Sequence, residues 1–140
     1  LLMDEFGFVV DTDVPYDQAI GLVVNGLKKE GFGVLTRIDV KETLKEKLGE
    51  DFRPYVIIGA CNPPLAHRAL SIDPGIGLML PCNVTVEEAE NGGSVIRLLN
   101  PKIMVDVGNF QDNSDLKFVS DEAYQKIKRV ALFLQGHTKP

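Results

Sequence analysis

The apolar stretch at residues 55–60, together with the proline-rich break after it, constrains the fold more than any other part of the sequence. The stretch reads YVIIGA, so both faces of a strand would be apolar there, which is typical of a strand inside a sheet. Cys61 closes the run, and Asn62 then precedes Pro63 and Pro64. Asparagine is favoured at a helix N-cap, and proline is favoured at the first helical position. The sequence therefore predicts a central strand that ends at Cys61 and a helix that begins at Pro63.

Four other segments have the pattern of strands, either a short apolar run or an alternation of apolar and other residues. They are residues 6–10, 32–40, 78–86 and 95–99. We expect the segment 32–40 to have one buried face. Asn91-Gly92-Gly93 precedes the last segment and indicates a hairpin turn. Pro81 has no amide hydrogen to donate, so it predicts an edge or a bulge within segment 78–86.

Two segments carry the apolar face of a longer amphipathic helix. The first begins near Tyr16 and ends before Gly31, and the second is capped by Ser120 and ends at Gly136. Residues 108–115 are polar and are predicted as a loop. Short helices are predicted after three capping residues: Asp39, Asn62 and Asn100. We expect one core, formed by Ile20, Val23, Leu27, Ile57, Leu80, Val84, Ile127 and Val130.

The composition is that of an ordinary globular protein. The 140 residues are 44% hydrophobic and 25% charged, so we expect a single domain over residues 1–140 with a proper core. The net charge of -5, without any cluster of more than two adjacent basic residues, argues against nucleic acid and membrane surfaces as partners. The first residues lack the pattern of a secretory signal, and the two cysteines are too few for a disulfide scaffold. We therefore expect a cytoplasmic protein with free thiols.

Cys61 is the strongest candidate for a functional residue, because it lies where a strand ends and a helix begins. The N-terminus of a helix carries partial positive charge, which favours the thiolate form of a nearby cysteine. The alternative is that Cys61 is buried as a small hydrophobic residue. An anion site is disfavoured at the same place, because Pro63 and Pro64 lack the amides that an anion would need.

Cys82 lies within an apolar strand segment and is either a core residue or the partner of Cys61 in a dithiol. Together with His67 the two cysteines would offer three metal ligands, but the spacing contains no Cys-x-x-Cys pair, so we expect no metal. His67 falls on the outer side of its helix, which also disfavours a Cys-His nucleophile pair. Asn62 and Asn83, which follow the two cysteines, are explained structurally as caps or turn residues. The ligand-binding candidates are Cys61, Asn62, His67, Cys82 and Asn83.

The chain resembles the domain of unknown function 302 family. The resemblance is carried by Gly59-Ala60-Cys61-Asn62-Pro63-Pro64-Leu65-Ala66, by Leu80-Pro81-Cys82-Asn83-Val84, and by residues 30–36 and 38–41. It implies an α+β fold, in which one antiparallel sheet is covered by two main helices in a β-α-β(4)-α, TBP-like order. The short helices are then insertions. The family has no established activity, and some members are associated with sulfur-oxidation or redox gene sets.

These observations lead to three hypotheses for function. The first is a binding or accessory domain with a small-ligand or thiol-linked site around Cys-Asn-Pro-Pro, whose cofactor is unknown and whose partner is an unidentified small molecule or protein. The second is an enzyme, a thiol-dependent redox or sulfur-transfer protein that uses Cys61. The third is a structural or oligomerisation domain without a site. The sequence leaves the oligomeric state open, with a homodimer as the candidate.

Overall fold

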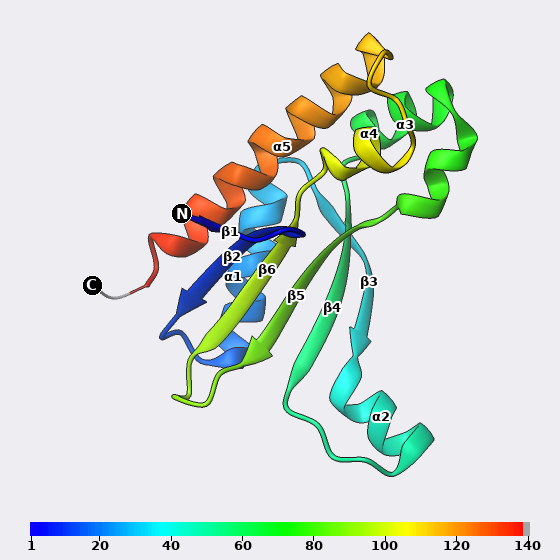
Figure 1. Cartoon of the computed structure of the whole chain (residues 1–140). Helices are drawn as coiled ribbons and strands as arrows, with labels where there is room; N and C mark the ends of the chain where they lie inside the picture. The colour runs from blue at the N-terminus through cyan, green and yellow to red at the C-terminus, as the bar shows by residue number, and fades with distance from the viewer. Residues whose placement is uncertain (139–140) are drawn as a thin grey trace.

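The computed structural model describes residues 1–138 and shows one antiparallel sheet with helices on one of its faces (Figure 1). The strand order is β1-β2-β6-β5-β4-β3. The strands are β1 (Leu2–Met3), β2 (Gly7–Thr12), β3 (Gly33–Asp39), β4 (Tyr55–Cys61), β5 (Cys82–Glu88) and β6 (Ser94–Leu99). This α+β architecture confirms the predicted fold class, with β1 as an addition at the sheet edge.

Two long helices, α1 (Tyr16–Lys29) and α5 (Ser114–Gln135), lie side by side on one face of the sheet (Figure 1). Phe8, Ile58, Val84 and Ile96 are among the fully buried sheet residues that contact this helical layer. Burial of these apolar side chains is the main contribution that stabilises the packing of the helices on the sheet. The main core therefore lies between the sheet and α1 and α5.

The shorter helices gather at two ends of the molecule (Figure 1). Three of them, α3 (Pro63–Ile72), the 3-10 helix η1 (Pro74–Met79) and α4 (Ile103–Val107), form a second apolar cluster with the first half of α5. Helix α2 (Val40–Leu48) lies at the opposite end, where it follows β3. As predicted, Asp39 caps α2. Gly49 ends the helix in the left-handed conformation, at φ 68°. None of the described helices is both long enough and apolar enough to cross a bilayer.

The predicted strand at residues 78–86 is wrong in its first half, which belongs to η1 and the turn after it. The Asp73 carboxylate accepts a hydrogen bond from the amide of Gly75 at 2.8 Å, and Pro74 occupies the first helical position. This local cap outweighs the apolar alternation, so Leu78 is 94% exposed instead of being part of a strand face. The strand begins at Cys82, after a cis Leu80-Pro81 peptide.

Helix α5 begins earlier than predicted. Asn113 is its N-cap and accepts a hydrogen bond from the amide of Leu116 at 2.9 Å, whereas Ser120 lies inside the helix and is 1% exposed. Leu116 and Val119 continue the buried face by one and a half turns towards the N-terminus. The polar segment 108–115 is therefore a loop only as far as Asn113.

Two predictions of burial are wrong because helices cover only one face of the sheet. Strand β3 is an edge strand in which only Val34 is partly buried, and not a strand with one buried face. Ile57 is partly buried on the face of β4 opposite to α1 and α5, whereas its neighbour Ile58 is fully buried. Of the other predicted core residues, Ile20 and Leu80 are only partly buried, and Leu80 packs against the second cluster.

Candidate functional site

Asn62 joins three elements at the end of β4. Its side-chain oxygen accepts a hydrogen bond from the amide of Leu65 at 3.3 Å, which caps α3 as predicted, with Pro63 in the first turn. Its side-chain nitrogen donates to the carbonyl oxygen of Glu30 at 3.2 Å, at the end of α1. Asn62 is 8% exposed, so both of these bonds lie in a protected place. Its polar atoms are therefore occupied by the fold.

Gly31 allows this close approach between α1 and Asn62. Its φ is 82°, a left-handed conformation that favours glycine, and an added Cβ would lie 3.0 Å from the side-chain nitrogen of Asn62. The amide of Phe32 then returns to the carbonyl oxygen of Leu27 at 2.9 Å. Gly31 thus acts as a left-handed cap after α1, which ends before it as predicted, and it directs the chain into β3.

A cavity of about 350 Å³ lies next to this junction. It opens to solvent on one side and is lined by parts of β3, β4, α3, η1, α4 and α5, and by the turn before β5. Among the described residues that line it, none has a charged side chain, and most are apolar. The lining residues are Phe32, Leu35, Ala60, Cys61, Asn62, Leu65, Ala66, Ala69, Leu70, Gly77, Leu80, Pro81, Cys82, Met104, Val119 and Ala123.

Both cysteines line this cavity and are free thiols. Cys82 is directly opposite Ala60 in the β4–β5 ladder, so Cys61 is one position away from a cross-strand pair with it. Because successive side chains of a strand point to opposite faces, this register does not favour a disulfide between them. Cys82 is 9% exposed and Cys61 is half-buried. Burial raises the pKa of the Cys82 thiol from 9.0 to about 11, with a smaller contribution from Cys61.

The structure brings Cys61, Asn62 and Cys82 together around the cavity, but it does not bring His67 or Asn83 there. His67 is exposed on the outer side of α3, as predicted, and Asn83 is exposed on β5. Within residues 1–138, no group of three or more His, Cys, Asp and Glu side chains could hold a metal ion. Cys61, His67 and Cys82 are therefore not brought together as three ligands of one metal ion.

Sequence reasoning missed several lining residues, because distant parts of the chain contribute them. Met104 comes from α4 and Val119 from α5, and both belong to the second apolar cluster. In a regular strand, the side chain of Leu35 would point to the face opposite to that of Val34. The β3–β4 register shifts between Val34 and Thr36, however, so this rule does not apply to Leu35. No local signal in the sequence marks this shift.

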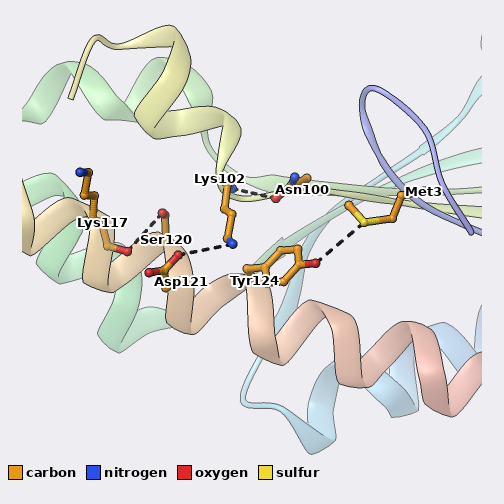
Figure 2. A network of polar contacts seen from close by, with 7 residues as sticks. All are labelled: Met3, Asn100, Lys102, Lys117, Ser120, Asp121 and Tyr124. Atoms are coloured by element: carbon orange, nitrogen blue, oxygen red, sulfur yellow. Dashed lines mark hydrogen bonds and ion pairs between the residues drawn. The ribbon is translucent and has the colours of Figure 1, made fainter. Parts of the chain in front are cut away.

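Polar contacts link the start of α4 to α5, and α5 to β1 (Figure 2). The amine of Lys102 lies 3.7 Å from the Asp121 carboxylate and 4.2 Å from the centre of the Tyr124 ring. Its amide donates to the Asn100 side chain at 3.0 Å, and the Tyr124 hydroxyl lies 3.9 Å from the sulfur of Met3. Because the ion pair is exposed, it adds little stability. The contacts lie beside α4, whose residue Met104 lines the cavity.

The comparisons with known proteins agree with this fold. The family model described as "Domain of unknown function DUF302" matches residues 8–132. The chain belongs to the DUF302 family. A crystal structure of an uncharacterized conserved DUF302 protein from Bacillus stearothermophilus is 33% identical, with a TM-score of 0.79. The match covers 97% of this chain and 100% of that one. No curated protein matches the chain.

Proposed function

We propose that this DUF302 domain binds a small, neutral and predominantly apolar ligand in the cavity beside Cys61. The observation that carries the proposal is the cavity itself, whose volume of about 350 Å³ lies in the range of ligand pockets. Its apolar lining offers hydrophobic contact, and the thiols of Cys61 and Cys82 are its main polar groups beside the amide of Asn62. The compound that fits this lining is one without a charge.

The surroundings of the cavity support a neutral ligand for two reasons. An anion would need free amide donors, but Pro63 and Pro64 have none, and Asn62 already makes two bonds within the protein. A buried charge without a partner is strongly unfavourable, and among the described lining residues there is no Asp, Glu, Lys or Arg to oppose it. A charged ligand would therefore lose its hydration without any compensating contact.

A second candidate function is thiol-dependent redox chemistry or sulfur transfer through Cys61. Its support is that both thiols of the protein line one cavity. We rank it second, because burial raises the pKa of Cys82 to about 11 and the ladder register does not favour a disulfide. The neutral thiol form of Cys82 is a poor nucleophile at physiological pH.

The test uses a neutral fluorescent dye, N-phenyl-1-naphthylamine, and two neighbouring positions of α3. Ala66 lines the cavity, whereas His67 is exposed and does not. We expect the native protein to bind the dye, Ala66→Leu to weaken binding at least tenfold by filling the space, and His67→Leu to bind normally. Thermal unfolding of both variants checks that each is folded. Equal binding by Ala66→Leu and the native protein would contradict the proposal.

Native mass spectrometry of the purified protein separates the three hypotheses. A bound neutral compound that is absent from Ala66→Leu would support the binding function. A mass gain of one sulfur atom that is lost in Cys61→Ser would favour sulfur transfer instead. A bare protein that also fails to bind the dye would favour a structural domain.

A further inference from the structure

The edge strand β3 contains a bulge beside the cavity. Val34 pairs with Ala60 and Thr36 pairs with Gly59, so Leu35 is an extra residue without a partner of its own on β4. Bulges of this kind redirect a side chain and are frequent next to binding sites. Here the local packing is tight, because the Thr36 hydroxyl lies 2.2 Å from where a Cβ of Gly59 would be. The bulge therefore occupies a defined place beside β4.

The redirected side chain of Leu35 reaches the cavity and also remains in water. Leu35 is among the lining residues although it is 66% exposed, and Leu70 of α3 is likewise a lining residue that is 39% exposed. Two large apolar side chains from different elements thus form an exposed rim of the cavity. Clustered exposed apolar side chains of this kind commonly mark a binding site.

We propose that the ligand is an elongated neutral molecule, whose apolar chain begins in the cavity and extends outwards across Leu35 and Leu70. The inference rests on the proposed function and adds the shape of the ligand to it. The inner part of the chain contacts uncharged residues such as Met104 and Val119. The outer part covers the apolar rim, so each further carbon that reaches Leu35 removes more apolar surface from water. Affinity then increases with chain length beyond what the cavity alone can hold.

The experiment measures displacement of N-phenyl-1-naphthylamine by a series of 1-alkanols from hexanol to dodecanol. Leu35→Ser removes the apolar rim on β3. Leu48→Ser is the matched control, because Leu48 is also a leucine, is 67% exposed, and lies on α2 at the other end of β3. We expect Leu35→Ser to weaken dodecanol binding about fivefold and hexanol binding less than twofold. Leu48→Ser should match the native protein throughout, and both variants should unfold at the native temperature.

Three results would overturn the inference. If Leu35→Ser binds dodecanol as well as the native protein does, the chain does not cross the rim, although the cavity function stands. If Leu35→Ser weakens hexanol and dodecanol equally, Leu35 shapes the cavity and does not contact an outer chain. If the native protein binds neither the dye nor any alkanol, the proposed function fails and the inference fails with it.

Discussion

Cys61 and Cys82 are almost opposite each other in the sheet, yet their surroundings differ. Cys82 faces the apolar side of β5 and is 9% exposed, whereas Cys61 ends β4 directly before α3 and is half-buried. Burial raises the pKa of Cys82 from 9.0 to about 11 because the charged thiolate loses its hydration. At pH 7 the Cys82 thiol is therefore almost entirely protonated. The two thiols should therefore differ in reactivity, although they share one cavity.

We predict that iodoacetamide alkylates Cys61 at least about tenfold faster than Cys82 at pH 7. The reagent reaches Cys61 more readily, while Cys82 is both shielded and protonated. The measurement is the rate of mass gain against pH, with Cys61→Ser and Cys82→Ser reporting one thiol each. The Cys82 rate should rise steeply only as the pH approaches about 11. Equal rates at pH 7 would remove the physical basis for a reactive Cys61.

Asn62 shows how one side chain can connect elements that are distant in the sequence. It caps α3 through the Leu65 amide, and it also receives the end of α1 by donating to the Glu30 carbonyl oxygen. The cap alone is typical of asparagine at this position. The second bond fixes the position of α1 relative to α3, and with it one side of the cavity.

We predict that Asn62→Ala lowers the free energy of unfolding by about 2–3 kcal/mol, of which about 1 kcal/mol is the cap and the rest is the Glu30 carbonyl left without its donor. Asn113→Ala is the matched control, because Asn113 caps α5 through the Leu116 amide and should lose only about 1 kcal/mol. Asn62→Asp keeps the accepting oxygen but turns a buried carboxylate oxygen towards the Glu30 carbonyl oxygen, so it should lose at least as much as Asn62→Ala. Urea denaturation measures all three variants. Equal losses for Asn62→Ala and Asn113→Ala would mean that the bond to Glu30 contributes nothing.

The helices and strands show which sequence signals are sufficient by themselves to predict where an element begins or ends. The start of α3 at Pro63 was predictable, because the cap and the proline are adjacent in the chain and act locally. The hairpin between β5 and β6 was predictable for the same reason. The start of α5 was not, because Ser120 and Asn113 both have capping side chains, and only packing of Leu116 and Val119 against α3 and α4 decides between them. The bulge at Leu35 depends on the partner strand and has no local signal.

At the scale of the whole molecule, the sheet has one face covered by α1 and α5 and another face that these helices do not cover. The sequence of β4 does not reveal this asymmetry, because the residues of YVIIGA that point to either face of the strand are all apolar. Ile57 and Ile58 could therefore not be distinguished from the sequence, although the structure places them on opposite faces. Similarly, the single predicted core is divided into two clusters, because α3, η1 and α4 form a layer of their own with α5.

We predict that Ile58→Ala lowers the free energy of unfolding by about 2–5 kcal/mol, since it leaves a cavity at a fully buried position. Ile57→Ala should lose less than about 1.5 kcal/mol, because Ile57 is only partly buried. The two residues are adjacent and identical in strand preference, so their difference isolates burial against the helices. The measurement is urea denaturation at several protein concentrations. If Ile57→Ala loses as much as Ile58→Ala, and its loss increases with protein concentration, a second copy of the chain covers the open face in solution. A large loss that does not depend on concentration would contradict the one-sided packing of the sheet.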